Sequence, residues 1–208
     1  IKGILWYQGE SDVDIESASS YEKRFIDAVA SWRNALNDPQ LPILTVQLNR
    51  VIGRPEADLG WSIIREAQRI VAKRDSKIAI IPTLDLPLSD LIHTSPAGNM
   101  ILGERLAHAA LDLLNEQKQN HNAPDVEKIS YIAKQKIEIY FSYVQSYINC
   151  IEPHLNMFLI EDEIGRIPVT DIHFPNNASI QIELARQPTG HLKVSGGWGS
   201  SPSTVAVD

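Results

Sequence analysis

Cysteine is almost absent from this chain, and its scarcity limits how the fold can be stabilised. Among 208 residues there is one cysteine, Cys150. A single thiol cannot form an internal disulfide, so the fold must depend on buried apolar surface and not on a cross-linked framework.

An excess of positive charge and long apolar runs are also missing. The 19 Lys and Arg residues are outnumbered by 26 Asp and Glu residues, which gives a net charge of −7. A nucleic-acid-binding protein would carry a basic patch, so we expect no nucleic-acid partner. No apolar run approaches the ~20 residues that a membrane-spanning helix needs, so we expect no membrane partner.

An initiator methionine and a signal peptide are lacking as well. The chain begins at Ile1, on the first residues of an apolar stretch that indicates a strand. A natural domain seldom starts inside a strand, so we expect that further residues precede Ile1 and that any export signal lies among them.

Strands and helices alternate through the first half of the sequence. Short apolar runs rich in β-branched residues predict buried strands, and longer segments with apolar residues every three or four positions predict helices. The predicted strands are residues 4–7, 41–48 and 77–84, and the predicted helices are residues 17–36, 61–73 and 96–115. This alternation with short connections is typical of an α/β fold whose parallel sheet is covered by helices on both faces.

The predicted helices carry recognisable inward faces and one clear start. Ser95 followed by Pro96 indicates a helix N-cap and first helical position. The residues expected to face the core are Tyr21, Phe25, Val29 and Trp32 in the first helix and Ile64, Ala67, Gln68 and Val71 in the second.

The second half of the chain has a different pattern. Residues 116–125 are polar, and we interpret residues 117–125 as a linker between an α/β domain over residues 1–116 and a β-rich domain over residues 126–208. Alternating apolar residues separated by turn residues predict a small antiparallel, sandwich-like β region. These runs are Ile137-Ile139-Phe141, Leu155-Met157-Leu159, Ile180-Ile182-Leu184 and Leu192-Val194.

Polar residues crowd directly after the first predicted strand, in the order Gln8, Gly9, Glu10, Ser11, Asp12. In open α/β sheets, ligands bind beyond the carboxyl ends of the strands. A strand end has little structural need for Gln8 or Glu10, so we interpret both as functional. Ser11 and Asp12 have an alternative role as the N-cap of the following helix.

A second polar loop, residues 85–98, follows the third predicted strand and contains Asp90 and His93. A carboxylate near a histidine can hold one ring nitrogen as a donor and leave the other as a base. The Asp-x-x-His pattern is common by chance, and an exposed loop with a solvated histidine is the alternative. Its place at the same sheet edge as Gln8 and Glu10 favours a catalytic role.

Several short blocks in order give the sequence a family resemblance. They are WYQGESD at residues 6–12, WR at 32–33, LPILTVQL at 41–48, REAQ at 65–68, the Asp90–His93 loop, and LGERLA at 102–107. Together they resemble the carbohydrate-esterase branch of the SGNH (GDSL-like) hydrolases, typified by sialate O-acetylesterases and acetylxylan esterases. The resemblance covers roughly residues 1–115 and implies a flavodoxin-like α/β/α sandwich, often joined to β-sandwich modules. It also implies an O-acetylated carbohydrate substrate, no metal or other cofactor, and a secreted or periplasmic location.

The resemblance assigns roles to individual residues. His93 would be the general base that deprotonates a serine, and Asp90 would orient it. Gln8 would donate its side-chain amide to the oxyanion of the tetrahedral intermediate. Glu10 would support the histidine or a neighbouring loop, and Gly9 and Ser11 would lie against the substrate.

Two features depart from the family pattern. The nucleophilic serine of the family lies in a Gly-Gln-Ser-Asn block that does not occur in these 208 residues, so we expect it upstream. Thr94 stands where relatives usually have proline after the histidine. Ser11 is an alternative nucleophile, but only 82 residues (93 − 11) separate it from His93, too few for a complete hydrolase of this type.

The sequence also allows a function without catalysis. A carbohydrate-binding or scaffolding protein could retain the fold without chemistry. Trp198, in the segment GGWGSS, is a better candidate than Trp61 for stacking on a sugar, although packing explains both. The remaining histidines lack the spacing of metal ligands and are interpreted as packed or solvated: His108, His121, His154, His173 and His191.

Overall fold

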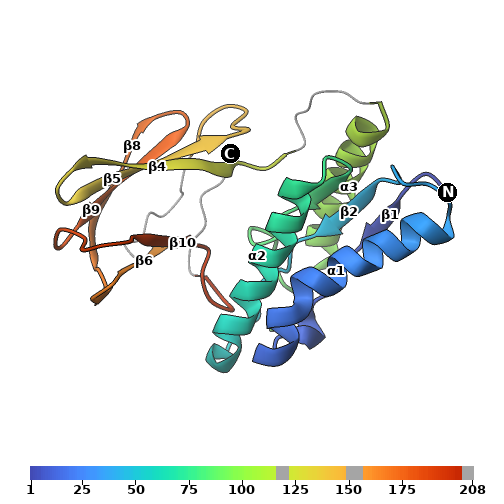
Figure 1. Cartoon of the computed structure of the whole chain (residues 1–208), viewed down its shortest axis with the longest axis horizontal. Helices are drawn as coiled ribbons and strands as arrows, with labels where there is room; N and C mark the ends of the chain where they lie inside the picture. Colours follow the sequence, from blue (N-terminus) through green and yellow to red (C-terminus); the bar gives the residue numbers. More distant parts are fainter. Residues whose placement is uncertain (116–121, 149–156, 203–208) are drawn as a thin grey trace. The chain divides into compact units, whose positions relative to one another are not determined.

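The computed structural model describes residues 1–115, 122–148 and 157–202, which fall into two compact units (Figure 1). The first unit comprises Ile1–Asn122 together with Gly199–Ser201, and the second contains Ala123–Trp198. Most of the predicted linker lies outside the described residues, as do His121, Cys150, His154 and Leu155.

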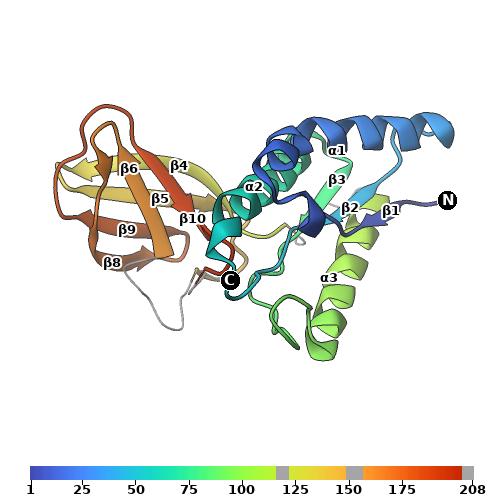
Figure 2. The ribbon, with the colours of Figure 1, turned by 90° about the horizontal axis from the view of Figure 1, so that it is seen from below.

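The first unit is built on a parallel three-stranded sheet in the order β1-β2-β3. Its strands are β1 (Ile4–Trp6), β2 (Ile43–Val46) and β3 (Ile78–Ile81). Helices α1 (Ile15–Ala35) and α2 (Asp58–Arg74) cover one face, and α3 (Pro96–Asn115) covers the other (Figure 2). The prediction of an α/β fold with a parallel sheet flanked by helices is confirmed.

The central strand β2 is buried on both faces because helices lie on either side of it. Ile43 packs in the core beneath α1 and α2, whereas Leu44 and Val46 pack on the side of α3. All four residues of β2 are buried, which explains why this strand has a continuous apolar sequence.

The helix faces follow the predicted periodicity. Tyr21, Phe25 and Val29 of α1 are buried, as are the four residues predicted for α2: Ile64, Ala67, Gln68 and Val71. At the start of α3, the Ser95 hydroxyl accepts a hydrogen bond of 3.1 Å from the Gly98 amide, which confirms the predicted cap.

The start of α1 differs from the prediction. Asp14 is the N-cap, and its carboxylate accepts a hydrogen bond of 2.9 Å from the Ser17 amide. Capping by Ser11 or Asp12 is therefore wrong, because both residues lie in the separate 3-10 helix η1 (Glu10–Asp12).

Strand β1 is less buried than its apolar sequence predicts. Leu5 is 63% exposed, so the expectation of a fully buried strand is wrong at this position. The physical reason is its place in the sheet: β1 is one of the two edge strands among those described, and α3 packs against β2 and the other edge strand, β3.

The second unit consists of two antiparallel sheets. The strands β4 (Asp125–Ala133), β5 (Lys136–Ser142), β9 (Ser179–Leu184) and β8 (Val169–Asn176) form one sheet in that order. The strands β10 (Lys193–Gly196), β6 (Phe158–Asp162) and β7 (Gly165–Arg166) form the other. Apolar residues of both sheets share one core, including Ile139, Ile160 and Ile182.

Strand β4 has no counterpart among the predicted alternating runs. It is an edge strand, and most of its residues are exposed, including Ile129 and Tyr131. A strand that buries neither face lacks the alternation by which strands are recognised. None of the helices in the described part of the chain has the length and apolarity needed to cross a membrane.

Candidate active site

The two polar loops identified in the sequence follow the carboxyl ends of β1 and β3. Because the strands are parallel, both loops lie at the same edge of the sheet, with the end of β2 between them. This is the edge at which open α/β sheets bind ligands.

The Gln8 side chain is held by a short polar network. Its amide nitrogen donates a hydrogen bond of 2.5 Å to Asp12 Oδ2, and Arg24 Nη2 donates one of 3.0 Å to Asp12 Oδ1. An amide nitrogen has two hydrogens, so this arrangement orients the Gln8 amide and leaves a second N–H to donate.

Gly9 is required by both its backbone conformation and its surroundings. Its φ of 144° lies in a region that other residues rarely adopt. A Cβ atom at Gly9 would lie 2.9 Å from Ile64 Cγ2 and 3.0 Å from Leu48 Cδ1. The glycine therefore lets the chain turn sharply against the core immediately after β1.

The backbone of the same turn is held by buried Gln68. The Gln68 side chain donates a hydrogen bond of 3.0 Å to the Gln8 carbonyl and accepts one of 3.0 Å from the Leu48 amide. The hydroxyl of Tyr21 also donates to the Gln8 carbonyl, at 3.0 Å, and burial raises the pKa of this hydroxyl. Gln68 thus ties together the ends of β1 and β2.

Asp90 and His93 form a direct pair in the loop after β3. Asp90 Oδ2 lies 2.7 Å from His93 Nδ1. The other carboxylate oxygen accepts hydrogen bonds from the backbone amides of Ile92 (2.9 Å) and His93 (2.8 Å). With its Nδ1 engaged by the carboxylate, the ring presents Nε2 as the available base, and the side chain is 76% exposed.

The same hydrogen bonds keep Asp90 ionised. The backbone amide of His93, followed by that of Ile92 and by the His93 ring, lowers the pKa of Asp90 to about 2. A carboxylate that is charged at neutral pH favours the imidazole tautomer with a proton on Nδ1, and it can stabilise the imidazolium that forms when Nε2 takes a proton.

Residues beside Gln8 and His93 connect the two loops. Tyr7 precedes Gln8, and Thr94 follows His93. Burial raises the pKa of the Tyr7 hydroxyl, and hydrogen bonding to the Thr94 side chain acts in the opposite direction. Asn49, just beyond β2, donates a hydrogen bond of 3.1 Å to Thr94 Oγ1. The loops after all three strands are therefore in contact.

The loop after β2 also supports the Asp90–His93 turn through its backbone. The Ile52 amide donates a hydrogen bond of 2.8 Å to the Leu91 carbonyl. Asn49 is 3% exposed, and its carbonyl accepts a hydrogen bond from the indole of buried Trp61. Trp61 is therefore a core residue of this unit.

Glu10 and Ser11 have fewer interactions than Gln8. Glu10 acts electrostatically on Tyr7 and raises the pKa of its hydroxyl, after the larger effect of burial. Ser11 is exposed in η1. Within the described residues, no hydrogen bond joins either side chain to His93.

Sequence reasoning assigned no individual role in the site to three of these residues: Tyr7, Asn49 and Gln68. Gln68 was identified as facing inward, but its bridging role was not. Tyr7 is the last residue of the first predicted strand, and Asn49 directly follows the second. A search of every polar residue at the carboxyl ends of the predicted strands would have found both. Thr94 departs from the family pattern, in which proline is usual at this position. Its hydroxyl accepts the hydrogen bond from Asn49, which a proline could not accept.

Comparison with known proteins identifies relatives of the first unit. Residues 1–112 match the family described as "Carbohydrate esterase, sialic acid-specific acetylesterase". Over 113 residues the chain is 37% identical to a protein of Arabidopsis thaliana named "Probable carbohydrate esterase At4g34215", covering 53% of this chain and 40% of that protein.

A solved structure resembles nearly the whole chain. It is XAC1771, described as a novel carbohydrate acetylesterase from Xanthomonas citri, and it matches with a TM-score of 0.81. The match covers 99% of this chain and 48% of that protein at 22% identity, so it establishes the shared fold. The chain spans less than half the length of both relatives.

The family match, the order of the sequence blocks and the α/β unit that carries them agree with one another. Because the match extends over 112 of the 208 residues, this chain belongs to the sialic acid-specific acetylesterase family of carbohydrate esterases.

Proposed function

We propose that the protein containing this chain is a serine esterase that removes O-acetyl groups from sialic acid or another acetylated sugar. The observation that carries the proposal is the 2.7 Å contact between Asp90 Oδ2 and His93 Nδ1, at the carboxyl edge of the sheet. This contact orients a histidine whose Nε2 can accept a proton.

In this proposal, the attacking serine comes from outside these 208 residues, as the family pattern implies. The serine oxygen attacks the acetyl carbonyl carbon while His93 Nε2 takes the hydroxyl proton. The imidazolium then gives that proton to the departing sugar oxygen, and an acetyl-serine remains. Water, deprotonated by the same histidine, releases acetate and restores the serine.

The Gln8 amide stabilises the negative oxygen of the tetrahedral intermediate. It comes from the loop after β1, at the same edge of the sheet as the His93 loop, and Asp12 holds its side chain in a defined orientation. Loss of one oxyanion donor typically lowers the rate by about 10²–10³.

The test is hydrolysis of an aryl acetate and of an O-acetylated sialic acid by the full-length protein. We expect His93→Ala to reduce kcat/KM by at least roughly 10³. His108→Ala, on helix α3, is the matched control and should retain wild-type activity. Unchanged activity in His93→Ala would exclude the catalytic assignment, and glycan binding without hydrolysis by the wild type would favour a binding protein.

Ser11 provides a second discriminating variant. In the proposed mechanism its hydroxyl contributes only to substrate contact, so Ser11→Ala should retain most of the activity. Complete loss of activity in Ser11→Ala, with a native circular dichroism spectrum, would instead identify Ser11 as the nucleophile.

A further inference from the structure

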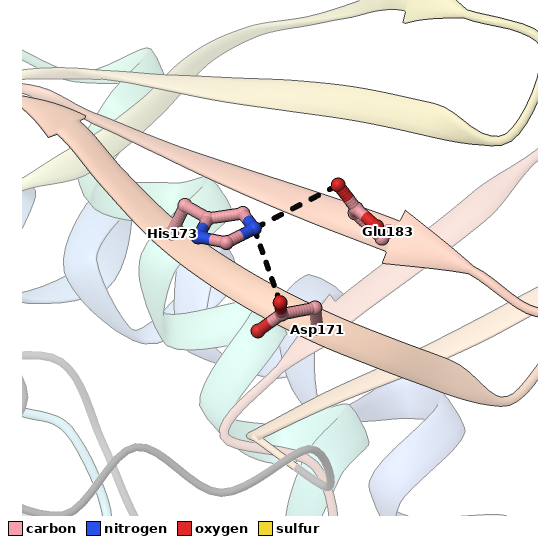
Figure 3. Close-up of side chains that lie close together, drawn as sticks. All are labelled: Asp171, His173 and Glu183. Carbon is pink, nitrogen blue, oxygen red and sulfur yellow. Dashed lines mark ion pairs between the residues drawn. The ribbon is translucent and has the colours of Figure 1, made fainter.

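Three side chains with metal-binding groups lie close together on strands β8 and β9 of the second unit (Figure 3). Asp171 and His173 lie two residues apart on β8, so both point away from the core, whereas Ile172 between them packs inward. Glu183 on β9 is the cross-strand partner of Asp171. The antiparallel pairing of β8 and β9 therefore brings the three side chains onto one face.

The distances within this cluster suit a small cation. His173 Nε2 lies 3.2 Å from Asp171 Oδ2 and 3.7 Å from Glu183 Oε1. Ligand atoms of the three residues all lie within 4.8 Å of one another. Tetrahedral Zn²⁺, with bonds of about 2.0–2.1 Å, requires separations of about 3.3 Å between ligand atoms. Small side-chain movements would satisfy this geometry.

The cluster is also partly oriented before any ion binds. Asp171 Oδ1 accepts a hydrogen bond of 2.8 Å from the Ile172 amide, which leaves Oδ2 directed toward His173. The backbone of both strands is held by the β8–β9 ladder, whose register runs unbroken from Asp171 to His173 between two irregularities.

A lysine forms an ion pair with the Glu183 carboxylate. Lys136 Nζ, on the neighbouring strand β5, lies 2.6 Å from Glu183 Oε1, the oxygen that also faces His173. A metal ion would compete with this ammonium group for the same oxygen. The lysine therefore weakens the site without blocking the His173 and Asp171 ligands.

We propose that Asp171, His173 and Glu183 form a binding site for Zn²⁺ that links the edge strand β8 to β9. One imidazole and two carboxylates match the ligands of Zn²⁺, whereas Ca²⁺ and Mg²⁺ favour sites made only of oxygen. The remaining coordination position is open to water. The site lies in the second unit and is independent of the proposed esterase mechanism.

The test is calorimetric titration of the 208-residue chain with Zn²⁺ at neutral pH, repeated with Mg²⁺ and Ca²⁺. We expect Zn²⁺ binding that His173→Ala weakens by at least roughly tenfold, and no comparable binding of Mg²⁺ or Ca²⁺. Lys136→Ala should strengthen Zn²⁺ binding several-fold because it removes the competing ammonium group.

His191→Ala is the matched control, since His191 is an exposed histidine of the same unit outside the cluster. It should leave Zn²⁺ affinity unchanged, and all variants should keep the wild-type circular dichroism spectrum because the altered side chains do not pack in the core. Failure of the wild type to bind Zn²⁺ would overturn the proposal. Equal affinity of wild type and His173→Ala would overturn it as well.

Discussion

At the scale of single residues, Asp90 has the most distinctive environment in the candidate site. Three hydrogen-bond donors converge on its carboxylate: the amides of His93 and Ile92 and the His93 ring. They place its pKa at about 2, compared with an ordinary value of about 3.9. The charged form is thus retained throughout the pH range in which a histidine base can operate.

This environment predicts a specific pH dependence for the loop. Because the pKa of Asp90 is lower in the folded than in the unfolded protein, the hydrogen-bonded turn gains stability above about pH 4 and loses it as the pH falls toward 2. An NMR titration of the Asp90 carboxyl carbon should give a midpoint near 2. His93→Ala should raise that midpoint only in part, because the backbone amides remain. A wild-type midpoint near 4 would contradict the loop geometry.

Buried Gln68 predicts an effect on stability. Gln68→Leu would leave the Gln8 carbonyl and the Leu48 amide without the partner that Gln68 provides. The Gln8 carbonyl keeps its hydrogen bond from the Tyr21 hydroxyl, so the Leu48 amide is the group that becomes unsatisfied. An unsatisfied buried group costs about 1–3 kcal/mol, so we expect the free energy of unfolding to fall by about 1–3 kcal/mol. Urea denaturation of the chain measures this change. Gln40→Leu, at an exposed position, is the control and should alter stability little.

At the scale of elements, a glycine determines how closely α2 approaches the turn after β1. A Cβ atom at Gly60 would lie 1.8 Å from the Val13 carbonyl oxygen. Gly60→Ala should therefore displace α2 and lower the free energy of unfolding by roughly 1–3 kcal/mol or more.

Gly103 provides the matched comparison on α3. A Cβ atom there would meet no neighbouring atom within 4 Å. Gly103→Ala should stabilise the protein by about 0.5–1 kcal/mol, because alanine loses less backbone entropy in a helix. Thermal unfolding of the two variants should thus shift in opposite directions. Unchanged or increased stability in Gly60→Ala would show that α2 does not approach the Val13 carbonyl this closely.

The elements that could be predicted from sequence are those whose burial leaves a pattern. Strand β2 is buried on both faces and therefore has a continuous apolar sequence. The inward face of α1 has apolar residues at helical spacing, so both elements could be recognised. Strand β4 was not recognised, since an edge strand exposed on both faces has no such pattern. The predicted cap of α1 was wrong because Ser11, Asp12 and Asp14 are all residue types that cap helices well. Asp14 is the cap because the backbone forms a separate 3-10 helix over the other two.

The site was predicted to a similar degree. The pairing of Asp90 with His93 could be predicted because the two residues are three positions apart in one loop. The bridges made by Gln68 and Asn49 depend on contacts between residues distant in sequence, which no local pattern contains. The cluster of Asp171, His173 and Glu183 was missed for the same reason, since strand pairing brings Glu183 to the other two.

At the scale of the whole molecule, the chain returns to the α/β unit near its described end. The Val51 amide donates a hydrogen bond of 2.9 Å to the Ser200 carbonyl. Asp58 Oδ1 accepts bonds from the Ser200 amide (2.7 Å) and hydroxyl (2.6 Å). Buried Arg65 donates to the Gly199 carbonyl, and burial lowers the pKa of Arg65 to about 10, which leaves it charged at neutral pH. No motif in the sequence predicts this return.

Ser200 should therefore contribute to the order of the loop that supports His93. Ser200→Ala removes the hydroxyl bond to a charged acceptor, which is typically worth about 1.5–3 kcal/mol. We expect faster hydrogen exchange at the Val51 and Ser200 amides. Ser201→Ala, at an exposed neighbouring position, should leave exchange unchanged. Equal exchange in the wild type and Ser200→Ala would show that this hydroxyl does not hold the segment in place.

The central claim is that the loops after β1 and β3 act on one reacting carbonyl. The most direct test is kcat/KM of the full-length protein for an aryl acetate, measured for Gln8→Ala, His93→Ala and the double variant. If both residues act in one transition state, Gln8→Ala should cost about 10²–10³ in the wild type and much less once His93 is absent. The same factor in both backgrounds, or no loss in Gln8→Ala, would contradict the claim.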